Sequence, residues 1–150
     1  MKTILITFAL LTAGCEREAN LKPIMPRDGS PIALRLSAPA PELVPTLERA
    51  AALWAQTGAR FTLDACDGVE VQVRVEALPI DINGRYEWVP APLITIDPIA
   101  VDHLPTVAHE LGHVLGVRHL RDDECGIMSV IDCGREELSA DDFAAFAEVR

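Results

Sequence analysis

The pattern of hydrophobic positions predicts strands and helices along most of the chain. Apolar residues at every second position predict half-buried strands at 32–36 and 69–75. Between them, residues 43–54 place leucine, alanine and tryptophan on one face of a helix. Shorter apolar runs predict further strands at 61–63 and 93–96. A strand, a helix and then several strands in this order are typical of an α/β domain.

Turn and capping signals add a hairpin and two more helices. Asn83 and Gly84 form a strong tight-turn sequence, so residues 80–88 are expected to form a hairpin. Apolar positions from Leu104 onward predict a helix that packs under the sheet. Ser139 is placed to cap a last helix, which has an apolar side of its own.

Length, composition and charge limit the classes of protein. The chain has 150 residues, of which 49% are hydrophobic and 24% charged, so one globular domain with a single core is expected. The formal net charge of −10 argues against a nucleic-acid-binding role, which requires a basic surface. A soluble protein outside the cytoplasm is compatible with this charge.

The N-terminal residues have the features of an export signal. Lys2 precedes a short apolar run that is too short to cross a membrane as a permanent helix. Residues 11–15 (LTAGC) resemble a bacterial lipoprotein box, in which Cys15 would become the lipidated N-terminus. A plain secretory signal with an incidental cysteine is the alternative.

These features predict how the N-terminus is organised. Residues 1–14 are the predicted signal peptide, and the turn-rich residues 15–31 are the predicted tether. Residues 32–150 are the predicted folded domain. We expect a protein exported to the bacterial cell envelope and held at a membrane by lipid, or a periplasmic or secreted protein under the alternative.

Residues 109–119 contain the candidate chemistry. They read HELGHVLGVRH, which is the pattern H-E-x-x-H-x-x-G-x-x-H. His109 and His113 are four residues apart, so one helix face presents both imidazoles to a single ion. Gly116 lets the chain leave the helix and return, which brings His119 to the same ion as a third ligand. Three protein ligands and one position for water are typical of catalytic zinc, so one Zn²⁺ is expected.

Glu110 is the candidate general base. It lies about 100° around the helix from His109, so its carboxylate is beside the metal without binding it. It would accept a proton from the zinc-polarised water that attacks a peptide carbonyl, and then pass the proton to the leaving amine. A non-catalytic zinc-binding surface lipoprotein is the alternative, and such a protein would not need Glu110. A zinc hydrolase with a non-peptide substrate also stays open.

The motif, together with Met128 nine residues later, resembles the metzincin zinc endopeptidases. Residues 107–129 are most similar to the matrixin branch and to small bacterial matrixin-like peptidases. The resemblance implies an α/β (α+β) fold with a twisted mixed sheet, a backing helix and an active-site helix. A small C-terminal subdomain with a Met-turn and a terminal helix would follow. Met128 would then pack beneath the histidines without binding the metal.

The resemblance also implies how a peptide or protein substrate binds to a monomeric enzyme. The last strand before the active-site helix would be the edge of the sheet and would pair with the substrate backbone. The residues of this strand are Leu93, Ile94, Thr95 and Ile96. Residues 129–137 would line the pocket for the substrate side chain that follows the scissile bond.

The cysteine pairing is left open by the sequence. Besides Cys15, the chain contains Cys66, Cys125 and Cys133. Export permits disulfides, and a bridge between Cys125 and Cys133 would close a short loop around Met128. Cys66 could equally pair with either of the other two.

Three further polar residues near the motif have simple explanations. His103 precedes the helix, and three ligands are already supplied, so we interpret it as a surface residue. Asp141 and Asp142 follow Ser139 directly, so we interpret them as acids that stabilise the start of the last helix.

Overall fold

The described residues of the computed structural model are 30–63, 69–88, 91–121 and 123–149. The predicted signal peptide (1–14), Cys15, most of the predicted tether (15–31) and Cys66 lie outside them. Within these ranges, no helix is both long enough and apolar enough to cross a membrane.

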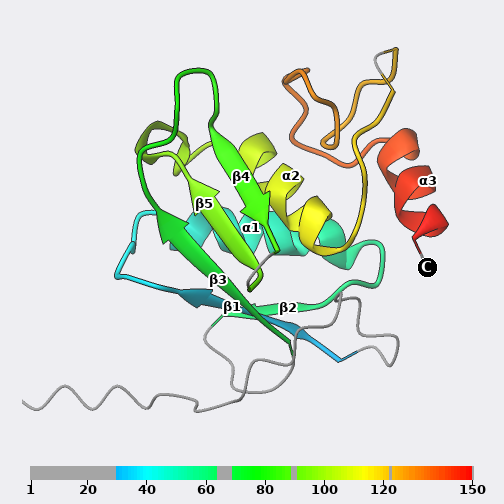
Figure 1. Cartoon of the computed structure of the whole chain (residues 1–150). Coiled ribbons are helices and arrows are strands. Elements are labelled where there is room, and N and C mark those ends of the chain that lie inside the picture. Colours follow the sequence, from blue (N-terminus) through cyan, green and yellow to red (C-terminus); the bar gives the residue numbers. More distant parts are fainter. Residues whose placement is uncertain (1–29, 64–68, 89–90, 122, 150) are drawn as a thin grey trace, which may run out of the picture.

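A mixed sheet of five strands forms one layer of the fold (Figure 1). Its strands are β1 (Ile32–Leu36), β2 (Phe61–Leu63), β3 (Val69–Val75), β4 (Gly84–Glu87) and β5 (Leu93–Ile96). The strand order is β2-β1-β3-β5-β4, in which β4 is antiparallel to β5 and all other neighbours are parallel. The alternating valines of β3 place Val71 and Val73 fully in the core, as the period of two requires.

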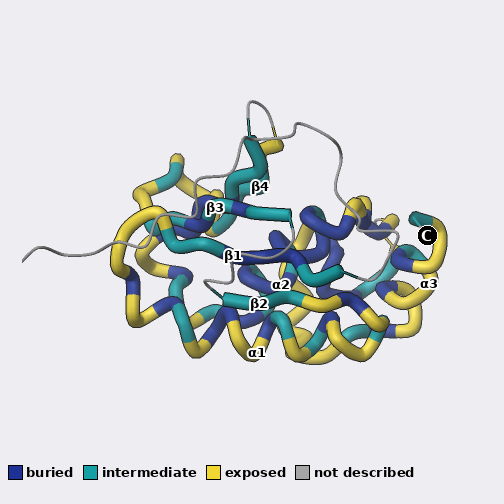
Figure 2. Tube along the Cα trace, turned by 90° about the horizontal axis from the view of Figure 1, so that it is seen from below, coloured by how far each residue is buried: buried dark blue, intermediate teal, exposed yellow. Residues whose placement is uncertain are grey.

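Two helices cover one face of this sheet. The helices of the fold are α1 (Val44–Ala55), α2 (Leu104–Val114) and α3 (Ala140–Glu148), with a short 3₁₀ turn η1 (Pro98–Ala100) before α2. α1 packs against α2, and Figure 2 shows that the side of α1 facing the sheet is buried while its outer side is exposed. This burial follows from the apolar stripe of each helix.

Trp54 connects the three helices. Its side chain is fully buried, and its indole Nε1 donates a hydrogen bond of 2.7 Å to the carbonyl oxygen of Ala108 in α2. Its ring centroid lies 6.1 Å from that of Phe146 in α3. The last helix is therefore packed onto the same core as the two helices under the sheet.

The hairpin predicted at residues 80–88 is wrong. Gly84 begins β4 and pairs with Ile96, so the two arms of the hairpin are β4 and β5. The carbonyl oxygen of Asn83 already accepts a hydrogen bond from Asp97 N at 2.9 Å, which extends the ladder through the expected turn. An isolated glycine in a strand can also mark a close approach between segments. Gly84 has this role, because it lets β4 lie close to Thr106 and Glu110 of α2.

The prediction that Leu93–Ile96 is the edge of the sheet is also wrong. β5 pairs with β3 on one side and with β4 on the other, so its backbone has no free edge for a substrate. Ile94, Thr95 and Ile96 are buried as well. The edge is β4, whose sequence Gly-Arg-Tyr-Glu has no apolar alternation by which it could be recognised.

The segment between α2 and α3 is irregular in its described residues. A disulfide joins Cys125 to Cys133, which settles the pairing that the sequence left open. Ser139 caps α3 as predicted, because its Oγ accepts a hydrogen bond from Asp142 N at 3.1 Å. This segment leads from the C-terminal end of α2 to the start of α3 (Figure 1).

Candidate metal centre

The structure brings the three predicted ligands together. α2 presents His109 and His113, and the chain then leaves the helix through Gly116, whose φ of +84° is the left-handed conformation that glycine tolerates. Val117 N donates to the carbonyl oxygen of Gly112 at 3.0 Å, and Gly116 N donates to that of His113 at 2.9 Å. These two bonds form a Schellman motif, which turns the chain back over the end of the helix.

The three imidazoles meet through the same ring atom. His113 Nε2 lies 3.1 Å from His119 Nε2, which in turn lies 3.2 Å from His109 Nε2. One ligand atom from each ring lies within 4.8 Å of the others. Zinc–nitrogen bonds of about 2.0–2.1 Å in a tetrahedron place two ligand nitrogens about 3.4 Å apart. The separations in the structure are close to this value.

Backbone carbonyls orient two of the rings. His109 Nδ1 lies 2.8 Å from the carbonyl oxygen of Ile127, and His113 Nδ1 lies 2.9 Å from that of Val117. A carbonyl oxygen only accepts, so each Nδ1 must carry the proton and each Nε2 must present a lone pair. Two fixed lone pairs and a third imidazole nitrogen within about 3 Å form a donor set that fits a zinc ion.

Burial keeps these imidazoles neutral. Desolvation lowers the pKa of His109 to about 4, although its bond to Ile127 acts in the opposite direction. Desolvation also lowers the pKa of His113. Both rings are therefore neutral at pH 7, with Nε2 free of a proton and able to bind a metal.

Glu110 lies in a dry environment beside the triad. Its side chain is 6% exposed, and desolvation raises the pKa of its carboxyl to about 7. Part of this cover comes from the edge strand, since a Cβ on Gly84 would lie 2.8 Å from Glu110 Oε1 and 2.9 Å from Thr106 Cγ2. Gly84 therefore allows the edge strand to approach the carboxylate closely.

Met128 lies beneath α2, as the resemblance implies. It is fully buried, and the sulfur packs directly over the Cα of Gly112, where a Cβ would overlap it. The same Cβ would lie 2.7 Å from Trp54 Cζ2. Gly112 immediately precedes His113, so Met128 and Trp54 support the helix at the level of the ligands.

His103 lies outside the cluster, as expected. Its Nδ1 is 2.8 Å from Thr106 Oγ1, and its Nε2 is 3.2 Å from Asp132 Oδ2. It therefore joins the start of α2 to the irregular segment.

The sequence did not reveal the polar partners of the ligands. The carbonyl groups of Val117 and Ile127 carry no signal in the sequence, because every residue has one. Asp142 was interpreted only as a helix-start acid, yet its carboxylate also accepts hydrogen bonds from the backbone beside Met128. The Ser139-to-Asp142 spacing of a capping box predicts the local bonds but not these longer ones.

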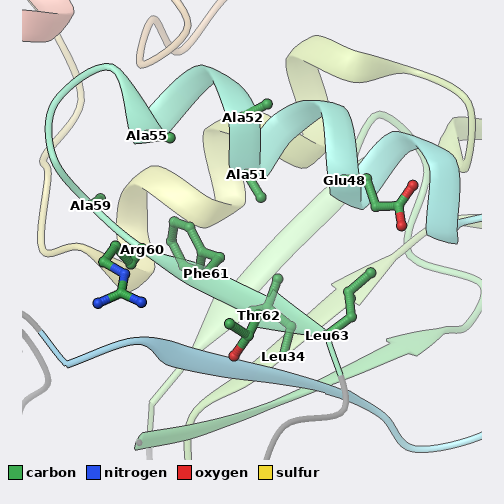
Figure 3. A pocket seen from close by; sticks show the side chains of 10 residues that line it. All are labelled: Leu34, Glu48, Ala51, Ala52, Ala55, Ala59, Arg60, Phe61, Thr62 and Leu63. Carbon is green, nitrogen blue, oxygen red and sulfur yellow. The ribbon is translucent and has the colours of Figure 1, made fainter.

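A separate cavity of about 450 Å³ lies between α1 and β2 (Figure 3). Its walls are mostly apolar, and Glu48 and Arg60 supply the charged groups of its lining. None of its lining residues belongs to α2 or to the segment that follows, so it is distinct from the histidine cluster.

Similarity to known proteins is found at the level of the fold and not of the sequence. No family model and no curated protein matches the sequence of this chain. Among solved structures, the chain is similar to archaemetzincin (AmzA) from Methanopyrus kandleri, with a TM-score of 0.55 and 12% sequence identity. The match covers 84% of this chain and 98% of that one. The predicted α/β fold is confirmed as metzincin-like, while the matrixin branch receives no specific support.

Proposed function

We propose that the protein is a zinc-dependent endopeptidase that acts on exported proteins. One observation carries this proposal: three imidazole nitrogens converge beside a buried carboxylate in a metzincin-like fold. A fold with a three-histidine cluster suggests a zinc metallopeptidase, and Glu110 supplies the base that hydrolysis requires.

The edge strand β4 is the proposed binding site for the substrate backbone. Among the described residues its outer side faces no other strand, and its start lies against Glu110 through Gly84. A peptide that adds to this edge as a further strand would therefore pass the histidine cluster. Val130 and Ile131, which are 66% and 79% exposed, offer apolar contacts for a substrate side chain in the predicted 129–137 loop.

The residues of the chain supply positioning and proton transfer. His109, His113 and His119 would hold the ion through Nε2. Bound zinc would polarise a water molecule and stabilise negative charge on the carbonyl oxygen. Glu110 would accept the proton of the attacking water and return it to the leaving amine. Its raised pKa favours this exchange, because a base is most effective when its pKa is near the working pH.

We further propose that the enzyme is exported and held at the cell envelope by lipid on Cys15. The lipoprotein-box resemblance of residues 11–15 and the turn-rich tether support this location. Mass spectrometry of the native N-terminus tests it, and an unmodified Cys15 would contradict it. The matrixin branch is proposed on the similarity of residues 107–129 alone.

Cleavage of a broad peptide library by the mature protein tests the enzymatic proposal. Zinc content should be equal in wild type and in Glu110→Gln, because Glu110 is not a ligand. We expect cleavage by wild type and a loss of about 10²- to 10⁴-fold in Glu110→Gln. Stoichiometric zinc without any cleavage above the variant would instead favour the non-catalytic zinc-binding lipoprotein.

A further inference from the structure

Asp142 is a buried carboxylate at the start of α3. Its side chain is 0% exposed, and within the described residues no lysine, arginine or histidine forms an ion pair with it. Burial of an ionised carboxylate is costly unless hydrogen-bond donors replace the lost water. Asp142 must therefore be stabilised by the neutral donors around it.

Four donors surround this carboxylate. Asp142 Oδ2 accepts hydrogen bonds from Ile127 N at 2.9 Å, from Ser139 N at 2.8 Å and from Ser139 Oγ at 2.9 Å. Its Oδ1 accepts a hydrogen bond from Met128 N at 2.9 Å. A helix cap accounts for the two bonds from Ser139, but the bonds to Ile127 and Met128 span 15 and 14 residues.

The backbone closes tightly over the carboxylate. A Cβ on Gly126 would lie 2.5 Å from Asp142 Oδ2 and 2.5 Å from Ser139 Oγ. Glycine is thus needed at the residue before the two amide donors, because any side chain would push the turn away from its acceptor.

The same turn orients a ligand. The amide of Ile127 donates to Asp142, and the carbonyl oxygen of Ile127 accepts from His109 Nδ1 at 2.8 Å. The amide of Met128 also donates to Asp142, while its side chain supports α2 at Gly112. A fixed carboxylate therefore determines where the carbonyl partner of His109 lies.

We propose that Asp142 is a positioning residue of the metal centre, which holds the turn at Ile127 and Met128 so that His109 presents Nε2 to zinc. This inference rests on the zinc site of the proposed function and does not require that the protein cleave peptides. Groups bonded directly to a metal ligand typically affect metal affinity by about 10- to 100-fold, and Asp142 lies one hydrogen bond beyond such a group, the carbonyl of Ile127.

Asp142→Asn tests the role with little change in shape. Asparagine replaces one acceptor oxygen with an NH₂ group, which then faces a backbone N–H in either orientation of the amide. The matched control is Asp141→Asn, which removes the same charge from the neighbouring, exposed residue. Val71→Ala is a second control, because it destabilises the core from β3, away from the turn.

Zinc affinity, measured by competition with a chelator at a temperature where all variants are folded, is the first readout. We expect Asp142→Asn to weaken zinc binding by about 10-fold, the lower end of the range for direct partners, and both controls to stay within about 3-fold of wild type. An unchanged affinity in Asp142→Asn would overturn the proposal and leave Asp142 as a helix cap. If wild type binds no zinc, the proposed function fails as well, whereas absent peptidase activity alone leaves this test intact.

The second readout is the nitrogen NMR signature of His109 in the zinc-free protein. We expect a protected Nδ1–H in wild type and in Asp141→Asn, and loss of that protection in Asp142→Asn. A merely structural role would leave this signal unchanged in every folded variant. Where Asp142→Asn does not fold, Gly126→Ala gives the same test, because its Cβ displaces the turn; retained Nδ1–H protection and affinity there would overturn the proposal.

Discussion

His109 and His113 are positioned by a buried helix, whereas His119 lies in an irregular segment. α2 packs against α1 through fully buried residues, among them Val107, Ala108 and Leu111. The described residues between α2 and α3 form no helix or strand, and His119 itself is exposed. One half of the metal centre therefore depends on a regular helix, and the other on an irregular segment held by directional polar bonds and a few buried side chains.

A few polar bonds, a disulfide and buried side chains such as Met128 hold the irregular half. Leu120 N donates to the carbonyl oxygen of Met128 at 3.0 Å, and Asp142 accepts from the backbone of the same turn. A disulfide between Cys125 and Cys133 closes the loop. Packing is shared among many contacts, so damage to α2 should reduce the stability of the whole fold. Damage to the irregular segment should instead change ligand geometry while the fold survives.

Removal of one ligand from each half should have the largest effect and should separate the two halves. We expect both His113→Ala and His119→Ala to weaken zinc binding by more than ~100-fold, because each removes a direct ligand. In zinc-free protein, His119→Ala should change the free energy of unfolding by less than ~0.5 kcal/mol, because the side chain is exposed. His113→Ala should cost about 1 kcal/mol through the lost bond to Val117. Chelator competition measures the zinc affinity, and urea unfolding measures the free energy of unfolding. Equal losses of unfolding free energy in the two variants would show that the helix and the irregular segment do not differ in this way.

Gly84→Ala should reduce activity by about 10- to 100-fold while zinc binding stays unchanged. The added Cβ would meet Glu110 and Thr106, so either the base or the edge strand must move. Arg85→Ala, on the next residue of β4, is the control for general disturbance of the edge. Steady-state kcat and zinc content test this, and full activity in Gly84→Ala would show that the edge strand does not constrain Glu110.

Gly112 lies within α2 and Gly116 just beyond its end, and substitution of these two glycines should give a smaller difference between the two halves. Gly112→Ala should lower the free energy of unfolding by about 1–3 kcal/mol, because its Cβ would overlap Met128 and crowd Trp54. Gly116→Ala meets no atom within 4 Å but must adopt a φ of +84°, at a cost of about 1–2 kcal/mol. Only Gly112→Ala should also expose Trp54, which fluorescence reports; an unchanged spectrum would contradict packing as the cause.

The pH dependence of zinc binding should be shallow, which is the smallest of the expected effects. Protons compete with zinc for an imidazole only below its pKa, and burial lowers the pKa of His109 to about 4 and also lowers that of His113. Three unperturbed imidazoles would lose affinity with a slope approaching three powers of ten per pH unit below about 6.5. We expect a clearly smaller slope between pH 6 and pH 5 by calorimetry, and a slope near three would contradict the burial of these rings.

Local patterns made much of the fold and of the cluster predictable. β3 and α1 have apolar positions at fixed periods, and all three histidines fall within one stretch of eleven residues. The hairpin at 80–88 gave β4 the wrong partner, because a tight-turn sequence at Asn83 and Gly84 says nothing of the pairing between β4 and β5. The strand order, and with it the true edge, depends on contacts between distant segments, which no local pattern encodes.

The wider role of Asp142 was missed for the same reason. The sequence Ser-Ala-Asp-Asp gives a complete local explanation for the acid as part of a helix cap. Its bonds to Ile127 and Met128 arise only when α3 folds back beside the turn, so they appear in the structure alone.

X-ray absorption at the zinc edge tests the central claim most directly, because it counts the ligands of the ion in the intact mature protein. We predict one zinc per chain with three imidazole nitrogens at about 2.0–2.1 Å and one oxygen ligand from water. The same measurement on His119→Ala should lose an imidazole contribution or the zinc itself. Substoichiometric zinc in wild type, sulfur among its ligands, or an unchanged spectrum in His119→Ala would contradict the account.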